Sequence, residues 1–273
     1  MLMRRRAALG LLLLPALAQP ALAQPALAQA ETRQMVPDAA VLHDLAPTGT
    51  LRAAINLGNP VLAQAGLDGP AGVSVDLARA LAARLGVPVA FVTYSGAGAV
   101  SGSAGTGAWD ICFLAIDPKR AEGIVFTEPY VRIAGRYLVP AASAIRSPDE
   151  VDRDGVRVSV GRGSAYDLFL TRALRHATLV RAPTSAEAVT AFARDGLEVA
   201  AGVDQPLAAY AASHPEVRLL PGHFMAIPQA MGLPVGRATG AAYLADFIAQ
   251  AKRDGLVRRG LEASGQDPDL AAP

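Results

Sequence analysis

The sequence has little of several residue types that carry metal, redox or polyelectrolyte chemistry. Its 273 residues include one cysteine and four histidines, and charged residues make up 18%. A single thiol cannot form an internal disulfide, and no metal-ligand spacing joins His43, His176, His214 and His223. We therefore expect no metal and no other cofactor. Cys112 lies inside an apolar run, so we expect it to be a buried, unreactive thiol.

Charge of either sign is also scarce and nearly balanced. Arg4, Arg5 and Arg6 are the only charged residues before Glu31. Without them, 22 basic residues face 24 acidic ones, a net charge of about −2. A nucleic-acid or anionic-membrane partner needs a basic face, so we expect neither partner. Hydrophobic residues make up 52%, which is ample material for one large or two modest folded domains.

The first residues have the organisation of an export signal. Arg4–Arg6 form a basic segment, residues 7–18 form an apolar one, and small-x-small sites follow in repeated Ala-Leu-Ala triplets. The apolar run is too short to span a bilayer and is interrupted by prolines, which argues against the alternative of a membrane anchor. No later run is long and apolar enough to span a membrane. We predict that residues 1–30 are a signal peptide that is removed on export.

Strands and helices alternate after this segment. Residues 51–56 are a predicted strand, 74–86 a helix with leucines four apart, and 87–94 a second strand, a unit that favours a parallel sheet. Ser74 or Asp76 is expected to cap the helix at its start. The alternation continues with strands at 109–116, 137–140, 156–160, 178–181, 197–203 and 217–220, with helices at 165–176, 185–194 (capped by Ser185), from Asp204 onward, at 241–253 and after Gly255, and with a loop or weak helix at 96–107.

Five motifs follow one another along this pattern. They are Gly49-Thr-Leu-Arg-Ala-Ala-Ile55, the helix ending at Gly86, Trp109-Asp-Ile with Asp117-Pro-Lys-Arg120 and Phe126-Thr-Glu-Pro-Tyr130, Gly161-Arg-Gly-Ser-Ala165, and Val203-Asp-Gln-Pro-Leu-Ala-Ala-Tyr210. In this order and spacing they resemble the bacterial extracellular solute-binding proteins of family 3, which serve polar amino-acid importers. The likeness runs from about Gly49 to Ser264.

The resemblance implies an α/β, periplasmic-binding-protein-like fold of type II, in which two α/β lobes joined by a two-stranded hinge close on a ligand. Lobe 1 would comprise residues 31–136 and 232–273, and lobe 2 residues 141–228, with crossovers at 136–140 and 228–232. The resemblance also implies a periplasmic, monomeric binding protein. Such a protein captures an amino-acid-like small molecule and passes it to the membrane permease of an ABC importer.

Three residues match the family's ligand contacts. Arg120 matches the arginine whose planar guanidinium binds both oxygens of the ligand carboxylate. Ser164 matches the anion-binding turn before a helix, and Asp204 matches the acid that receives the ligand ammonium. Each residue also has a structural alternative. Arg120 would then be a solvated surface charge, and Ser164 or Asp204 would be a helix cap.

The pocket around these residues departs from the family's pattern. Relatives commonly have an aromatic residue after the first strand, where this chain has Asn59 and Leu62. They often have a hydroxyl residue before the arginine turn, where this chain has Ala115, whereas Tyr94 keeps an aromatic position. We take Tyr94, Asn59 and Ala115 as further candidate contacts. With the Gly- and Ser-rich segment 96–107 in place of an amphipathic helix, the ligand need not be a standard amino acid.

Other functions fit the same resemblance. A dehydratase-like enzyme on this fold would need an acid or base in the cleft, for which Glu128 is the one further candidate, although its motif position indicates a structural role. A sensor module that presents its ligand state to a separate membrane partner is a second alternative. A binding protein that has lost its ligand is a third.

Overall fold

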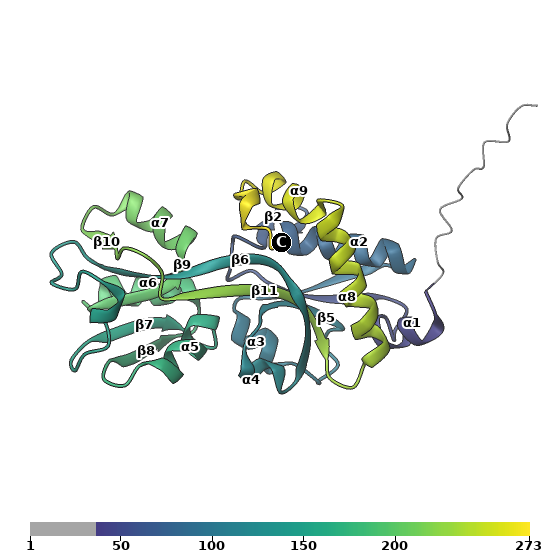
Figure 1. Cartoon of the computed structure of the whole chain (residues 1–273), viewed down its shortest axis with the longest axis horizontal. Helices are drawn as coiled ribbons and strands as arrows, with labels where there is room; N and C mark the ends of the chain where they lie inside the picture. The colour runs from purple at the N-terminus through teal and green to yellow at the C-terminus, as the bar shows by residue number, and fades with distance from the viewer. Residues whose placement is uncertain (1–36) are drawn as a thin grey trace, which may run out of the picture. The chain divides into compact units, whose positions relative to one another are not determined.

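The computed structural model describes residues 37–273, so the predicted signal peptide, residues 1–30, lies outside the described residues. The described part is a mixed α/β structure (Figure 1). Its helices are α1 (Ala39–Leu45), α2 (Val73–Leu85), α3 (Ala97–Gly102), α4 (Pro118–Ala121), α5 (Ala165–Ala173), α6 (Ser185–Arg194), α7 (Asp204–Ser213), α8 (Ala238–Arg253) and α9 (Leu256–Ala263). Its strands are β1 (Leu51–Asn56), β2 (Gln64–Gly66), β3 (Gly69–Ala71), β4 (Val89–Tyr94), β5 (Ile111–Ala115), β6 (Ile124–Pro140), β7 (Arg157–Gly161), β8 (Thr178–Ala182), β9 (Val199–Val203), β10 (Val217–Leu219) and β11 (Met225–Pro234). None of the helices in residues 37–273 is long and apolar enough to cross a membrane.

The main sheet has nine strands, and eight of them run in the order β4-β1-β5-β11-β6-β9-β7-β8, with β10 paired to β6. Each end of this order is parallel: β1 pairs in parallel with β4 and β5, and β7 pairs in parallel with β8 and β9. The predicted strand–helix–strand unit is therefore confirmed, since α2 connects the parallel strands β1 and β4. Between the two ends, β6 and β11 form a long antiparallel pair (Figure 1).

The strand β6 is much longer than the sequence predicts. Residues 137–140 were expected as a separate strand or crossover, but they are the last part of a 17-residue strand. Pro129, inside that strand, lies opposite Ala230, where the register with β11 shifts. A proline cannot donate a hydrogen bond to the ladder, so an irregular pair is where a strand tolerates it. The predicted crossover at 136–140 pairs with β9 and β10, and the one at 228–232 pairs with β5 and β6.

The start of α2 corrects one prediction. Neither Ser74 nor Asp76 caps this helix, because the N-cap is Gly72 and both residues lie inside the first turn. Gly72 has φ +112°, and a Cβ there would lie 2.7 Å from the carbonyl oxygen of Leu62. A side chain is therefore excluded at the cap by space as well as by backbone conformation. The predicted end is confirmed, since Gly86 terminates the helix in the left-handed conformation.

The start of α6 corrects a second prediction by one residue. The N-cap is Thr184, whose hydroxyl accepts a hydrogen bond from the N–H of Glu187 at 3.1 Å. Ser185, the expected cap, is the first helical residue. Its hydroxyl is 2.7 Å from the hydroxyl of Tyr166 and forms a hydrogen bond with it. Because its hydroxyl does not cap the helix, Ser185 can form this hydrogen bond with Tyr166 instead.

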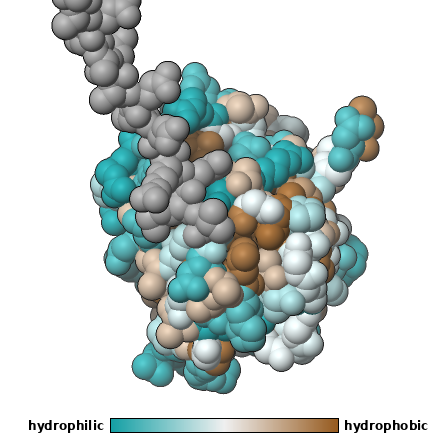
Figure 2. All heavy atoms as spheres, turned by 90° about the vertical axis from the view of Figure 1, so that its right-hand side faces the viewer, coloured by the Kyte–Doolittle hydropathy of each residue, from teal (hydrophilic) through white to brown (hydrophobic). Residues whose placement is uncertain are grey.

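Apolar side chains fill the space between the sheet and its helices. Cys112 belongs to this core, and burial raises the pKa of its thiol to about 12, as expected for an unreactive cysteine. Among the described residues, the exposed large apolar side chains are Leu67, Ile116, Val125 and Val235. Figure 2 shows one face of the molecule, on which hydrophobic residues gather in a small area among hydrophilic and intermediate ones. A small apolar area of this kind is ordinary on a protein surface.

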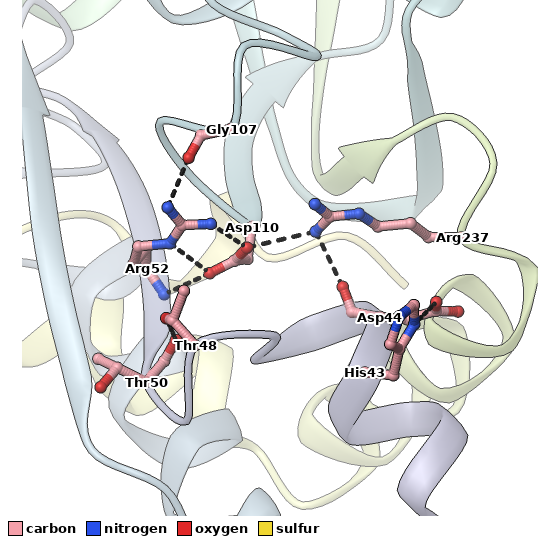
Figure 3. Close-up of polar contacts among 8 residues, drawn as sticks. All are labelled: His43, Asp44, Thr48, Thr50, Arg52, Gly107, Asp110 and Arg237. Carbon is pink, nitrogen blue, oxygen red and sulfur yellow. Dashed lines mark hydrogen bonds and ion pairs between the residues drawn. The ribbon is translucent and has the colours of Figure 1, made fainter.

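One polar cluster connects several elements near the first residues of β1 and β5 (Figure 3). The carboxylate of Asp110 is fully buried and accepts hydrogen bonds from Arg52 at 2.7 and 2.9 Å and from Arg237 at 3.3 Å. Arg237 also donates to the carbonyl oxygen of Asp44 at 2.8 Å. The cluster thereby links α1, strand β1, the start of β5 and the start of α8. It is a structural cluster, since none of its side chains lines the cavities described below.

Candidate ligand-binding site

Two adjoining cavities are lined by residues at or after the ends of strands from both parallel parts of the sheet. The smaller, which we call the anchor cavity, has about 40 Å³ and is lined by Asn59, Ala115, Arg120, Ser164 and Gln229 among others. The larger, which we call the side pocket, has about 360 Å³, and Val189, Pro206, Leu207 and Tyr210 contribute to its wall. Both cavities are lined by Gly58, Asn59, Tyr166, Ser185 and Val203. A pocket of this size suits a small molecule.

Arg120 is buried in the anchor cavity, with 4% of its surface exposed, so it is not the solvated surface charge of the structural alternative. Its guanidinium donates to the carbonyl oxygens of Ala115 and Gly163, each at 2.9 Å, and Nε has no hydrogen-bond partner. Burial lowers the pKa of Arg120 to about 10, so the side chain stays protonated at neutral pH. A buried cation held only by neutral groups favours an anion beside it.

The short helix α4 positions Arg120. Asp117 caps α4 by accepting the N–H of Lys119 at 2.8 Å, and Pro118 takes the first helical position, where a missing N–H costs nothing. The carboxylate of Asp117 also pairs with Arg172 at 2.7 Å. Asp117, three residues before Arg120, is thus bonded to Arg172 and not to Arg120, although its negative charge still raises the pKa of Arg120.

Ser164 caps α5, and its hydroxyl accepts the N–H of Asp167 at 3.0 Å. The turn before it is already hydrogen-bonded: Arg162 N–H donates to Ala182, Gly163 N–H to Asp167, and Ser164 N–H to Gly161. An anion at this turn would therefore meet the first N–H groups of α5, at Ala165 and Tyr166, which lack partners inside a helix. Both residues line the anchor cavity.

The turn of Ser164 also touches the Gly-rich segment. Within residues 96–107 the structure forms the short helix α3, one of the two outcomes expected. Gly163, with φ +67°, lies so close that a Cβ on it would be 2.6 Å from the Cα of Gly98. A Cβ on Gly98 would in turn be 2.9 Å from the carbonyl oxygen of Arg162. The small residues of α3 thus permit backbone contact between the two ends of the sheet.

The structure brings four of the six predicted site residues together: Arg120, Ser164, Asn59 and Ala115 all line the anchor cavity. Asn59 is buried, and its side-chain oxygen accepts the N–H of Val61 at 3.3 Å. Tyr94 lies apart. Its hydroxyl accepts a hydrogen bond from Ser103 at 3.0 Å, and it lines neither cavity.

Asp204 also lies apart from the cavity lining. It is the first residue of α7, whose N-cap is Val203, so the alternative role of Asp204 as the helix cap is wrong. The carboxylate instead accepts a hydrogen bond from Arg136 at 3.0 Å and lies 3.7 Å from Nε2 of His223. Its predicted role as an ammonium acceptor stays a prediction, and in this geometry its charge is already paired.

Sequence reasoning missed several residues that line both cavities or control their charge. Tyr166 and Ser185, joined by a hydrogen bond, line both cavities, and Gln229 lines the anchor cavity. Ser185 had been assigned to a helix cap, and Gln229 falls inside a predicted crossover. Arg136 stands at the other crossover. Arg136 lies on β6 opposite Gly202 of β9, two residues before Asp204, and this pairing of the two strands is not visible in the sequence. Among residues 37–273, no group of three His, Cys, Asp or Glu side chains lies together as a metal site would require.

The chain matches the model of the bacterial extracellular solute-binding proteins, family 3, over residues 52–262. The chain belongs to this family. No curated protein sequence matches it. The predicted resemblance is therefore confirmed, and with it the class of proteins that bind solutes outside the cytoplasmic membrane.

Solved structures of similar fold are type II periplasmic binding proteins. The solute receptor for L-cysteine of Neisseria gonorrhoeae has 22% identity and a TM-score of 0.72, with 83% of this chain and 97% of that chain covered. A P235GK mutant of ArgBP from T. maritima has 18% identity and a TM-score of 0.71, with 82% and 99% covered. An ancestral amino-acid-binding protein, a precursor of cyclohexadienyl dehydratase, has 25% identity and a TM-score of 0.68, with 81% and 97% covered. The predicted fold class is confirmed.

Proposed function

We propose that this protein is the substrate-binding component of an ABC importer and that it holds a small carboxylate of amino-acid size in a cleft between two lobes. The observation that carries the proposal is Arg120, a buried guanidinium in the anchor cavity with no carboxylate of the protein bonded to it. A ligand carboxylate supplies the missing charge and two acceptor oxygens. The similar structures named above include a receptor for L-cysteine, which supports a ligand of that size.

The proposed lobes are residues 31–136 with 232–273, and residues 141–228, of which the structure describes those from residue 37 onward. The pair β6 and β11 would serve as the hinge. The contact of Gly98 with Gly163 and the bond from Arg120 to the Gly163 carbonyl join residues of the two proposed lobes. A ligand bound by both sides would favour the closed arrangement, as in other two-lobed binding proteins.

An enzyme on this fold has less support. The side chains lining the anchor cavity and the side pocket include no Asp, Glu, His, Lys or Cys within the described part of the chain. Glu128, the candidate acid or base, is exposed and lines neither cavity. General acid–base catalysis needs such a group within reach of the substrate. An enzyme using these two cavities would therefore depend on Tyr166 or Tyr210 as its acid or base.

Two experiments test the proposal. Mass spectrometry of the purified protein under native conditions should reveal a retained small carboxylate, and cells that lack the gene should fail to accumulate that compound in its labelled form. Retention of a molecule without a carboxylate, or unchanged uptake, would contradict the proposal. For the periplasmic location, N-terminal sequencing of the exported protein should begin between Gln19 and Glu31.

A further inference from the structure

The acidic residues around the anchor cavity share one property. Asp117 pairs with Arg172 at 2.7 Å, Asp167 with Arg181 at 2.8 Å, and Asp204 with Arg136 at 3.0 Å. Each carboxylate thus has an arginine of the protein as its partner. Asp117 and Asp167 are buried, and Asp204 is about one-quarter exposed. A ligand ammonium would have to displace an arginine to reach any of these carboxylates.

Arg120 has the opposite property. It is the one charged side chain that lines the anchor cavity or the side pocket within the described residues, and its hydrogen bonds go to carbonyl oxygens. The two cavities together therefore present one positive charge and no negative charge. A ligand ammonium placed there would lie near a like charge, and the cavity linings offer it no carboxylate.

The pair of Arg136 and Asp204 is decisive because Asp204 is the family-predicted ammonium acceptor. Arg136 lies on β6 opposite Gly202, so its side chain reaches the first residue of α7 directly. The same guanidinium donates to the carbonyl oxygen of Leu220 at 2.7 Å. Two bonds from separate elements hold it in place. The protein's own cation thereby occupies the position that an ammonium would take.

We infer that the ligand is a small monocarboxylate without an ammonium group, with Arg136 of the protein replacing the positive charge that an amino-acid ligand would bring to Asp204. This inference rests on the proposed function and narrows its ligand class. The carboxylate binds Arg120 and the first N–H groups of α5. The uncharged body of the ligand extends into the side pocket, where Val189, Pro206 and Leu207 contribute apolar surface and Tyr166 and Ser185 offer hydroxyl groups.

Matched pairs of probes test the inference. The pairs are 3-phenylpropanoate with L-phenylalanine, and 4-methylpentanoate with L-leucine, each differing by one ammonium group. In calorimetric titrations of the full mature protein, the amine-free member should bind at least about tenfold tighter in one or both pairs. Equal or tighter binding of the amino acid overturns the inference but leaves the proposed function standing. If neither member binds and no carboxylate is retained from the cell, the proposed function fails and the inference with it.

Variants of Arg136 test the cause of the preference. Arg136→Met releases the carboxylate of Asp204, so the preference for the amine-free member should fall by about tenfold or more. Arg136→Lys keeps the positive charge and should keep the preference. The matched control is Arg157→Met. It breaks the ion pair between Arg157 on β7 and Glu198 just before β9, which has 2.8 Å between charged atoms and lies outside both cavities. A preference that is unchanged in Arg136→Met, with only a lower melting temperature, would assign Arg136 to stability alone and overturn its part in the inference.

Discussion

Arg120 and Arg136 differ in what each guanidinium binds. Arg136, like Arg172 and Arg181, holds a carboxylate of the protein, whereas Arg120 holds two carbonyl oxygens and leaves Nε without a partner. The arginine that lacks an internal acid is also the one that lines the anchor cavity. Near these cavities, the arginine without an acidic partner is therefore the candidate for ligand binding, and the arginines with such a partner make structural contacts.

The largest expected effect comes from removing the unpaired charge. Arg120→Ala should weaken ligand binding by about 2–5 kcal/mol, because it deletes the partner of a buried carboxylate. Arg120→Lys should restore part of the affinity, since an ammonium keeps the charge but lacks the planar pair of donors. Titration of the retained ligand, or of 3-phenylpropanoate, measures both changes.

A neighbouring cation provides the control. Lys119 precedes Arg120 on α4, but its side chain is exposed and pairs with Glu122 at the surface. Lys119→Ala should leave the affinity unchanged, because exposed ion pairs contribute little. If Arg120→Ala binds as tightly as Lys119→Ala, Arg120 is a structural residue and the comparison with Arg136 loses its meaning.

A buried carboxylate outside the site sharpens the same comparison. Asp110 is completely buried and holds both Arg52 and Arg237 (Figure 3). Asp110→Ala should lower the free energy of unfolding by about 2–3 kcal/mol, because it removes charged hydrogen bonds and leaves two arginines without their acid. Ligand affinity should stay the same in the fraction that folds. Chemical denaturation and titration measure the two quantities separately, and a loss of affinity would show that the cluster in Figure 3 is coupled to the site.

Much of the fold was predictable from local patterns. The leucines of α2, the Gly86 terminator and the apolar strands 51–56 and 109–116 each carry their own signal. No local pattern indicated the length of β6, because its 17 residues are held in one strand by pairing with β11 and β9. The helix caps of α2 and α6 lie two residues and one residue before the predicted ones. At Gly72 the reason is space, because a Cβ there would meet the backbone of Leu62.

The sequence motif was sufficient to predict where Arg120 lies, but not that Asp204 is paired. Arg120 follows a buried strand and a capped turn, and these local features place it where the motif predicts. The partner of Asp204 comes from residue 136, which is 68 positions away along the chain. Such a pairing depends on the register of β6 with β9, where Arg136 lies opposite Gly202. An ion pair between residues this far apart in the chain cannot be predicted from single motifs.

An intermediate effect is expected from the backbone contact between Gly98 and Gly163, which lies beside Arg120. Gly98→Ala would place a Cβ 2.9 Å from the carbonyl oxygen of Arg162, so the turn carrying Gly163 should be pushed away from Arg120. Ligand affinity should fall by about 1–2 kcal/mol, as for other overpacked contacts. Gly102→Ala is the matched control on the same helix, because a Cβ there meets nothing within 4 Å. Equal affinity of the two variants would mean that this backbone contact has no part in binding.

The smallest effect should come from the paired acid. In Asp204→Asn, Arg136 loses its partner, and the free energy of unfolding should fall by about 0.5–1 kcal/mol, since both side chains are partly exposed, at 21% and 24%. A double-mutant cycle with Arg136→Met should give a coupling of the same size, because either single variant breaks the same pair. The affinity for 3-phenylpropanoate should change by less than about threefold, or become slightly tighter as a negative charge is removed. A loss of more than about tenfold for L-phenylalanine in Asp204→Asn would show that the carboxylate does receive a ligand ammonium. In that event Asp204 would leave Arg136 and bind the ligand ammonium instead. An ion pair in the ligand-free protein would then not exclude a residue from the binding site.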